Sequence, residues 1–286
     1  MSSLQNKIDF AVIFSVKNAN PNGNPLNGNR PREDYDGYGE MSDVCIKRKI
    51  RNRFIDLSKE DESLKVFVQS DDRNIDGFKS LRDRADACEA LKKAEKNKDN
   101  TAFAKAACEQ WMDVRSFGQV FAFKGSEVSV GVRGPVSIHP AFSVSPIEIQ
   151  SIQITKSVNS VTGDKKSSDT MGTKHRVPFG LYVFYGSINC QLAELTGFND
   201  EDADKILWAL RSLFENDTSS ARPDGSMEVC KVCWWKHNNK NGQYSSAKVH
   251  RSLKIEPKAE NPHSIDDYEI ELDKLEELEP QVYDEL

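Results

Sequence analysis

The sequence predicts an α+β fold whose elements follow the ferredoxin-like order β-α-β-β-α-β, which RNA-recognition modules share. Three observations lead to this prediction. Apolar residues alternate in several strand-like runs, two other segments carry apolar stripes at helical spacing, and two polar stretches interrupt the series. We therefore expect residues 1–255 to form one domain with insertions at 59–112 and 156–176, followed by an acidic C-terminal tail at 256–286.

The first strand and the first helix are the clearest elements. Residues 8–16 are apolar on both faces, as in a strand at the centre of a sheet. A helix is expected at 43–57, because Ser42 can cap its first turn and apolar residues recur at helical spacing. This buried stripe consists of Ile46, Ile50, Phe54 and Leu57.

The later elements are less regular. Residues 78–112 predict two helices with a break near 97–100, in a segment polar enough to be an insertion. Strands are expected at 127–138, with a bend at 133–135, and at 147–154, 177–188 and 228–235. A second core helix is expected to start at Asn199 or Asp200. Its inward residues are Ile206, Leu210, Leu213 and Phe214.

The charge of the chain is unevenly distributed. The 286 residues carry a net charge of −6, but residues 256–286 hold twelve Asp or Glu and two Lys, so the rest carries about +4. We expect the tail to be a solvated acidic segment; it could instead screen a basic groove or dock on a neighbouring subunit. No apolar run reaches the roughly 18 residues that span a bilayer, so a cytoplasmic location is expected. The six scattered Cys predict reduced thiols.

The most informative segment is the Asn-rich loop at residues 18–32. It contains Asn, Pro, Gly and Arg but no carboxylate, and its backbone is shaped by residues that favour turns. Such a surface suits the phosphates, sugars and base edges of RNA, although an ordinary connection rich in Asx turns fits equally well. The candidate RNA-binding residues are Asn18, Asn20, Asn22, Asn27, Arg30 and Arg32.

Two further stretches are basic. Lys47, Arg48 and Arg51 fall on one flank of the helix predicted at 43–57. Residues 156–176 join two apolar strands and are expected to project as a hairpin that clamps a single strand, with Met171 at its tip as a wedge; a mobile surface loop is the simpler alternative. The cationic candidates in this segment are Lys156, Lys165, Lys166, Lys174, His175 and Arg176.

No cofactor, metal or catalytic site is predicted. Cys230 and Cys233 have the spacing of a zinc knuckle, with His237 and His250 as the only partners, but residues three apart on a regular strand point to opposite faces. Two alternatives remain for catalysis. Asp34, Asp36 and Asp43 could hold a divalent cation beside a phosphodiester. His175 could act as a general base in a metal-independent cleavage.

Four stretches, taken together, resemble a known family. They are NPNGNPLNGNRPR at 20–32, DVRSFGQVF at 113–121, VGVRGPVSI at 130–138 and TMGTKHRVPFGLY at 170–182. In this order they resemble the backbone subunit of Cascade, the type I CRISPR surveillance complex, especially its type I-C form, within the RAMP superfamily. The resemblance extends from about residue 6 to residue 237.

The resemblance implies a right-hand shape, with an RRM-like palm, helical fingers at about 59–112 and a thumb at about 156–176. Copies of such subunits assemble head to tail along the crRNA spacer and kink the guide, whose bases pair with target DNA. The other Cascade subunits are the remaining partners, and no membrane is involved. The guide would contact the Asn-rich loop, the flank of Lys47, Arg48 and Arg51, Arg133, and residues 171–176.

Two other functions remain open. Related backbone subunits of type III systems are metal-dependent RNA endonucleases, and Asp34 or Asp36 would carry that activity here. A general single-strand-binding protein would need exposed aromatic stacking platforms. The Asn-rich loop and the 156–176 segment contain no aromatic residue, and at least one of Trp234 and Trp235 is expected in the core.

Overall fold

The computed structural model describes residues 2–58, 60–123, 129–156 and 171–284, and its main sheet is organised around strand β1 (Ile8–Ala19). β1 runs antiparallel to β10 (Met171–Ile188) on one side and to β11 (Met227–Lys236) on the other. Its residues from Ile8 to Phe14 are all buried, because both faces of this strand are covered. The predicted central strand is confirmed and extends three residues further than expected.

The main sheet continues on both sides of this centre. Its order is β14-β11-β1-β10-β8-β4-β3-β2, and β7 also pairs with β10. All pairings are antiparallel, so the predicted mixture of helices with antiparallel strands is confirmed. The additional strands are β2 (Gly23–Asn24), β3 (Arg30–Glu33), β4 (Tyr38–Met41), β7 (Val136–Ile138), β8 (Ala141–Pro146) and β14 (Gln281–Asp284).

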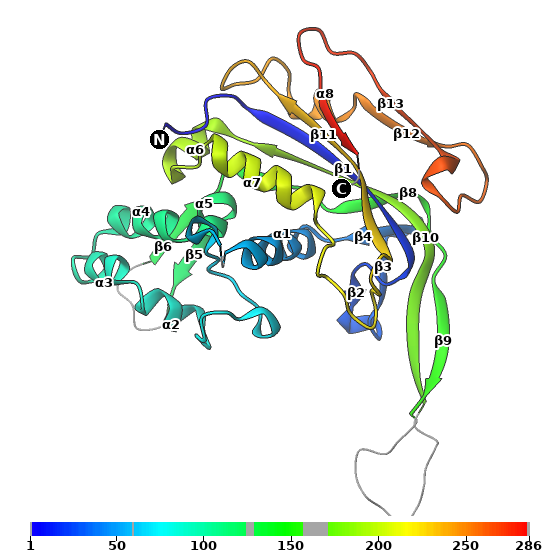
Figure 1. Ribbon diagram of the computed structural model, residues 1–286, viewed down its shortest axis with the longest axis horizontal. Coiled ribbons are helices and arrows are strands. Elements are labelled where there is room, and N and C mark those ends of the chain that lie inside the picture. The colour runs from blue at the N-terminus through cyan, green and yellow to red at the C-terminus, as the bar shows by residue number, and fades with distance from the viewer. Residues whose placement is uncertain (1, 59, 124–128, 157–170, 285–286) are drawn as a thin grey trace, which may run out of the picture.

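One face of the sheet is covered by α1 (Asp43–Leu57), α6 (Cys190–Thr196) and α7 (Asp200–Arg211) (Figure 1). Both predicted N-caps are observed: the Ser42 hydroxyl accepts a hydrogen bond from the Cys45 amide, and Asn199 forms a capping box with Asp202. The predicted stripes of both helices lie in one hydrophobic cluster with the inner face of β1. The helices are therefore fixed by the apolar burial that their periodicity predicted.

The other face is covered by the C-terminal part of the chain, which corrects the prediction of a solvated tail. Here α8 (Ser246–His250) and the hairpin of β12 (Leu253–Pro257) and β13 (Tyr268–Leu272) pack on the sheet. The acidic composition hid a buried apolar set, which alternates with the charges. Within the tail this set comprises Tyr268, Leu275 and Leu278, which belong to one cluster with Val249 and Leu253 just before the tail.

Residues 67–123 and 129–132 form a helical unit with a hydrophobic core of its own at one end of the sheet (Figure 1). The segment predicted as two helices contains more, because its helices break at Ala87 and Trp111 as well as near residue 98. The core is aromatic and includes Phe67, Phe103, Trp111 and Phe121. The elements are α2 (Leu81–Asp86), α3 (Glu89–Lys96), α4 (Asn100–Gln110), α5 (Met112–Phe117), β5 (Gly118–Ala122) and β6 (Ser129–Arg133).

The strand predicted at 127–138 is divided at the expected bend. β6 pairs with β5 inside the helical unit, whereas β7 pairs with β10 in the main sheet. Gly134 sits at the division, where a Cβ atom would lie 2.3 Å from the carbonyl oxygen of Ser116. Only glycine allows α5 and the chain after β6 to approach this closely.

Two buried ion pairs join the helical unit to the helices of the sheet. On α5, Asp113 accepts a hydrogen bond from Arg51 of α1 at 2.9 Å. Two residues later, Arg115 binds both carboxylate oxygens of Asp202 on α7, at 2.9 and 2.8 Å. Paired planar groups of this kind fix an orientation as well as a distance, so α5 is held between α1 and α7.

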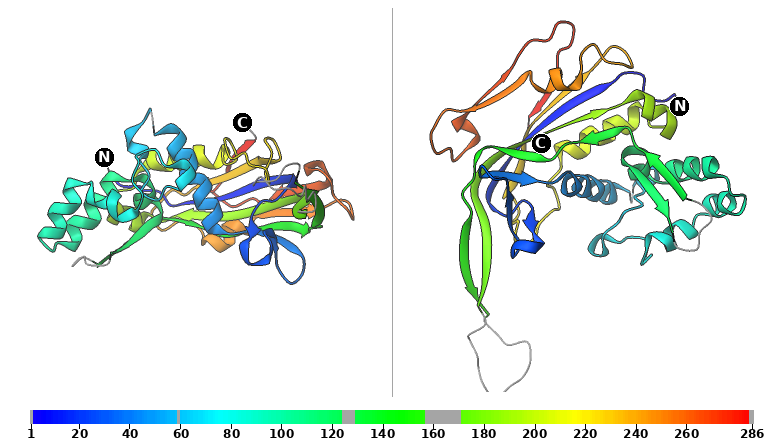
Figure 2. Two further views of the ribbon diagram at one scale, coloured as in Figure 1. Left: turned by 90° about the horizontal axis from the view of Figure 1, so that it is seen from below. Right: turned by 180° about the vertical axis from the view of Figure 1, so that it is seen from behind.

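A long hairpin leaves the opposite end of the sheet. It consists of β9 (Gln150–Thr155) and the first six residues of β10. Figures 1 and 2 show it projecting away from the helical unit and from the helices that cover the sheet. The strand predicted at 147–154 therefore corresponds to β9, and β8 before it was not predicted. Short 3-10 helices occur at Pro25–Asn27, Glu62–Leu64, Asp71–Arg73 and Ile265–Asp267. Among the described residues, no helix is both long and apolar enough to cross a lipid bilayer.

A buried carboxylate ties the start of β1 to the segment after β11. Asp9 is fully buried and lies 3.0 Å from the Lys7 ammonium and 2.8 Å from Nε2 of His237. The Gln243 amide donates to Nδ1 of His237, so Nε2 carries the hydrogen and donates to Asp9. Burial alone raises the pKa of the Asp9 carboxyl, but hydrogen bonds from His237, Ser246 and Lys7 outweigh it and hold the pKa below its usual value.

This arrangement predicts a pH-dependent contribution to stability. A lowered folded-state pKa stabilises the fold above the unfolded-state value, about 3.9, and this contribution is lost as pH falls through the folded-state value. We expect Asp9→Asn to lower the free energy of unfolding at pH 7 by about 1–3 kcal/mol. The difference between wild type and variant should shrink below about pH 4, measured by urea denaturation at several pH values. A difference that is constant from pH 7 to pH 2 would contradict the assignment.

Candidate nucleic-acid interface

The Asn-rich loop is a rigid structure rather than an open connection. Asn18, Gly28 and Asn29 adopt left-handed backbone angles, with φ of 54°, 56° and 59°, which Asn and Gly tolerate best. Asn20 is buried, and its side-chain amide donates to the Asn29 carbonyl at 2.7 Å. The Asn22 side chain accepts from the backbone amide and the hydroxyl of Ser42, which joins the loop to the start of α1.

Arg30 of this loop points toward the projecting hairpin. Arg30 donates to the Ser151 hydroxyl on β9 at 3.2 Å, and Ser151 is hydrogen-bonded to Nδ1 of His175 on β10. Arg32 is partly exposed on β3, and its Nε has no hydrogen-bond partner among the described residues. The Asn-rich loop and the base of the hairpin, two segments that the sequence singled out separately, are therefore in contact.

The hairpin places the predicted residues differently from the expectation. Met171 lies on β10 opposite Thr155, not at the tip of a lobe, and its side chain is 62% exposed. Arg176 approaches the side-chain oxygen of Gln150 at 3.3–3.4 Å. Lys165 and Lys166, together with most of the predicted 156–176 segment, lie outside the described residues.

A third segment, which sequence reasoning missed, completes this surface. Loop 217–222 follows α7, and its Ser220 carbonyl accepts a hydrogen bond from the Lys174 ammonium at 2.6 Å. The Ala221 carbonyl accepts from the Asn20 amide at 2.9 Å. We call residues 18–32, 150–155, 171–176 and 217–222 the loop–hairpin surface. Loop 217–222 gave no signal in the sequence, because backbone carbonyls make its contacts with Lys174 and with the Asn20 amide.

The three cations predicted on one flank of α1 have three different environments. Lys47 is paired with Asp43 at 2.9 Å, and Arg51 is turned inward onto Asp113 and the ring of Phe117. Arg48 is exposed, and it makes no ion pair among the described residues. Arg51 therefore joins α1 to the helical unit, and the expectation that all three cations face one ligand stays a prediction.

Arg133 lies apart from the loop–hairpin surface. It is exposed at the end of β6, which pairs with β5 in the helical unit (Figure 1). Asn27, in contrast, is exposed on the short helix between β2 and β3, within the surface. The loop–hairpin surface thus brings together most of the predicted residues that the structure describes, but Arg133 and the three cations of α1 lie outside it.

Among the described residues, the second face of the sheet, which lies opposite α1, α6 and α7, offers no open platform of aromatic rings. RNA-recognition modules stack bases on that face, but here α8 and the β12–β13 hairpin cover it. Trp234 and Trp235 are both buried, on opposite faces of β11. The prediction that at least one of these rings belongs to the core is confirmed.

The carboxylates predicted as alternative catalytic residues also have defined surroundings. One carboxylate oxygen of Asp34 accepts from the amides of Asp36 and Tyr38, which forms a turn, while Asp43 is paired with Lys47. Both Asp34 and Asp36 are exposed. Within the described ranges, no three His, Cys, Asp or Glu side chains are grouped in a way that could hold a metal ion.

The Cys pair on β11 corrects one geometric expectation. A β-bulge shifts the register of β11 against β1 at Phe14, so Cys230 and Cys233 both contact the cluster on the second face instead of pointing apart. Burial raises the pKa of the Cys233 thiol to about 11, so this group stays protonated at neutral pH. All six Cys are free thiols, as predicted.

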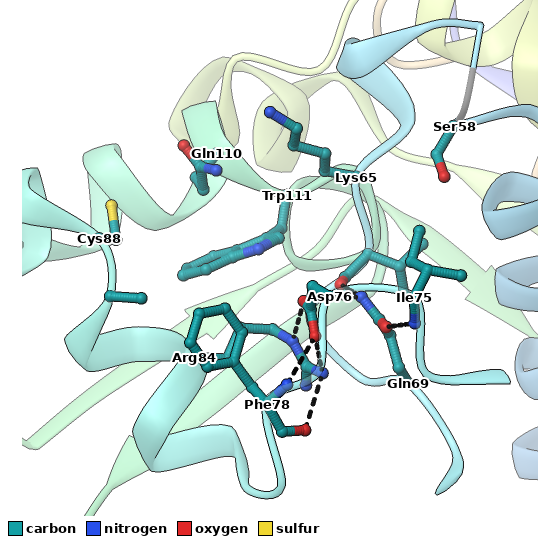
Figure 3. Close-up of a pocket in the computed structure, with 12 residues that line it drawn as sticks. Ser58, Lys65, Gln69, Ile75, Asp76, Phe78, Arg84, Cys88, Gln110 and Trp111 are labelled. Carbon is teal, nitrogen blue, oxygen red and sulfur yellow. Dashed lines mark hydrogen bonds and ion pairs between the residues drawn. The ribbon is translucent and has the colours of Figure 1, made fainter. Parts of the chain in front are cut away.

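A separate cavity of about 330 Å³ lies in the helical unit (Figure 3). Its walls are largely apolar and include Ile75, Phe78 and Trp111. At one side the Arg84 guanidinium binds the Asp76 carboxylate at 2.6 and 2.8 Å. No predicted RNA-binding residue lines this cavity, and its chemistry suits an apolar group rather than a phosphate.

Comparison with known proteins identifies the family. A match to the CRISPR-associated protein Cas7 family covers residues 6–273. This chain belongs to the Cas7 family. The CRISPR-associated protein Cas7 of Haloferax volcanii is 23% identical over 300 residues, which cover 98% of this chain and 85% of that protein. The family predicted from the four sequence motifs is thus confirmed.

A solved structure shares the fold of this Cas7-family chain. A chain of a CRISPR RNA-guided surveillance complex, in a pre-nicking state, matches with a TM-score of 0.50 and 16% sequence identity. The match covers 84% of this chain and 83% of that chain. At this level of identity, the likeness concerns the fold alone.

Proposed function

We propose that this chain is a non-catalytic backbone subunit of a type I-C Cascade, which binds crRNA and polymerises head to tail along the spacer. The match to the Cas7 family over residues 6–273 is the observation that carries this proposal. The loop–hairpin surface supports it, because this surface gathers amide and cationic groups from three distant segments. The partners are the crRNA, further copies of the chain, the other Cascade subunits and, through the guide, target DNA.

In this proposal the parts of the fold have separate roles. The main sheet with α1, α6 and α7 is the RRM-like palm, the helical unit is the fingers, and the β9–β10 hairpin is the thumb. The thumb of one copy reaches the next copy and kinks the guide at that position. The bases between kinks stay free for pairing with target DNA, as sequence recognition by a guide requires.

Recognition of the RNA backbone fits the chemistry of the surface. A subunit that accepts any spacer must bind phosphates and 2′-hydroxyl groups rather than base edges. The predicted contacts are amides and cations, and the face on which related modules stack bases is covered by the C-terminal segment. A head-to-tail interface that does not close then produces a helical filament.

The proposal predicts ladder-like assembly. Native mass spectrometry of the chain mixed with crRNA and the other Cascade subunits should show several copies added stepwise to one intact RNA. The maximum copy number should rise with spacer length and stay the same for two spacers of equal length and unrelated sequence. RNA without the CRISPR repeat is the control for specific assembly.

Other outcomes would identify another function. One copy per RNA, whatever the spacer length, would indicate a general single-strand-binding protein and overturn the backbone assignment. RNA shortened only in the presence of Mg²⁺ would indicate the nuclease alternative, and Asp34→Asn and Asp36→Asn would then be expected to abolish the cleavage.

A further inference from the structure

Loop 217–222 rests on a group of charges that includes a buried lysine. The Lys49 side chain is 3% exposed and forms an ion pair with Asp217, whose side chain is 14% exposed. Arg222 Nε donates to the same carboxylate at 3.1 Å. The Lys49 ammonium also lies over the ring of Phe214, at 5.4 Å from its centroid. We call Lys49, Asp217 and Arg222 the anchor cluster.

The anchor cluster is connected to each part of the loop–hairpin surface. Lys49 comes from α1, one residue after the exposed Arg48. Arg222 approaches the Asn20 carbonyl at 3.5 Å, and Asn20 in turn holds Asn29 at the other end of the Asn-rich loop. The carbonyls of the same loop accept hydrogen bonds from Lys174 on the hairpin and from the Asn20 amide. Loop 217–222 therefore contacts α1, the Asn-rich loop and the hairpin.

The composition of the cluster indicates a role in geometry more than in stability. A buried ion pair is often no more stabilising than apolar residues of the same volume, because its charges lose their hydration. It does fix the direction of its partners, since hydrogen bonds are directional and apolar contacts are not. Two cations that share the Asp217 carboxylate hold loop 217–222 in a single orientation against α1.

We propose that Lys49, Asp217 and Arg222 are positioning residues, which set the spacing between the Asn-rich loop, the hairpin and α1 so that their polar groups match successive nucleotides of a single strand. This inference rests on the proposed function and adds residues to it. None of the three needs to touch RNA. Their effect on binding passes through Asn20, Ser220 and Ala221, whose contacts they fix.

The test uses a substitution for which simple electrostatics and positioning predict opposite results. Asp217→Asn removes a negative charge close to the surface, so long-range electrostatics alone would strengthen RNA binding. Positioning predicts weaker binding of single-stranded RNA. It also predicts that the slope of log K against log [salt] becomes less steep by about 0.7 to 1.4, which corresponds to one or two lost phosphate contacts. This loss would occur although the variant removes no basic residue.

Asp224→Asn is the matched control. Asp224 is exposed on the next turn and accepts a hydrogen bond from the Thr218 hydroxyl. This variant removes the same charge without touching the anchor cluster, and it should bind RNA as tightly as wild type or more tightly. If Asp217→Asn fails to fold, Arg222→Lys replaces it, because this variant keeps the charge but loses the fork that reaches both Asp217 and Asn20.

A second readout is independent of RNA. Hydrogen exchange of the free protein should accelerate at residues 20–32 and 171–176 in Asp217→Asn, but not in Asp224→Asn and not in the centre of β1. If the wild type does not bind RNA, the proposed function fails, whereas this exchange pattern still reports on the cluster. Unchanged exchange in both segments, or RNA binding that Asp217→Asn leaves equal or stronger, would overturn the positioning role.

Discussion

Asp113→Ala is expected to lower the free energy of unfolding by about 3–5 kcal/mol, the cost of removing one partner of a buried ion pair. Asp113 is 1% exposed and accepts three hydrogen bonds. They come from the backbone amides of Phe67 at 2.7 Å and Val68 at 3.1 Å, and from the Arg51 guanidinium at 2.9 Å. The substitution leaves two buried amides and one cation without their acceptor.

The loss should be visible in the helical unit first. Asp113 joins the irregular segment before α2 to α5 and to α1, so its removal loosens the attachment of the whole unit to the sheet. Urea denaturation followed by tryptophan fluorescence measures the effect, and Trp111 in the core of this unit is one of the four Trp that contribute to the signal. Since domain stabilities are typically about 5–15 kcal/mol, a loss of this size would partly unfold the variant at 37 °C.

Glu109→Ala is the matched control for Asp113→Ala. Glu109 lies on the neighbouring α4, and its exposed pair with Lys105 spans 3.9 Å. An exposed pair of this kind contributes about 0–1 kcal/mol, so the control should be close to wild type. A loss of less than about 1 kcal/mol for Asp113→Ala would contradict the structural role given to this carboxylate.

The elements that could be predicted from the sequence are those fixed by local rules. Ser42 and Asn199 cap helices because their side chains reach amides three residues away, and the stripes of α1 and α7 repeat within a few turns. The C-terminal strands were missed for the opposite reason. Their apolar residues are separated by acids and find a partner only on the far side of the sheet, which no local pattern records.

The same distinction between local patterns and long-range contacts explains which parts of the site could be predicted. The Asn-rich loop and the hairpin were found because their composition is unusual, whereas loop 217–222 acts through backbone carbonyls and has no such signature. Lys47, Arg48, Lys49 and Arg51 are similar in the sequence. Their roles differ because Asp217 and Asp113, which are distant in the chain, meet Lys49 and Arg51 but not Arg48.

The four family motifs divide in the same way. The stretch 20–32 and the described part of 170–182 contribute to the loop–hairpin surface, but 113–121 and 130–138 lie at the junction of the helical unit and the sheet. There Asp113 accepts its three hydrogen bonds, and Gly118 and Gly134 allow two segments of the chain to approach each other closely. Two of the motifs that identify the family are therefore best explained by folding rather than by RNA contact.

The largest effect on RNA binding is expected from replacing Arg30, Arg32 and Lys174 together by Ala. Each charge-assisted hydrogen bond contributes roughly 1.5–3 kcal/mol, and 1.4 kcal/mol corresponds to a factor of ten, so affinity for the guide should fall by about 10³-fold or more. The slope of log K against log [salt] should become less steep by about 2, because each of the three lost phosphate contacts to a single strand contributes about 0.7 to this slope. Both changes should be equal for spacers of unrelated sequence, as backbone contacts require.

The control for this variant removes three cations elsewhere. Lys93, Lys96 and Lys105 are exposed on the helices of the helical unit, and their joint replacement by Ala changes the net charge of the chain by the same amount. If RNA binding depended on net charge alone, the two triple variants would lose affinity equally. A loss confined to the first variant, with thermal unfolding unchanged in both, would assign the phosphate contacts to the loop–hairpin surface. Equal losses would instead mean that this surface is not the site, because long-range attraction acts wherever the positive charge is placed.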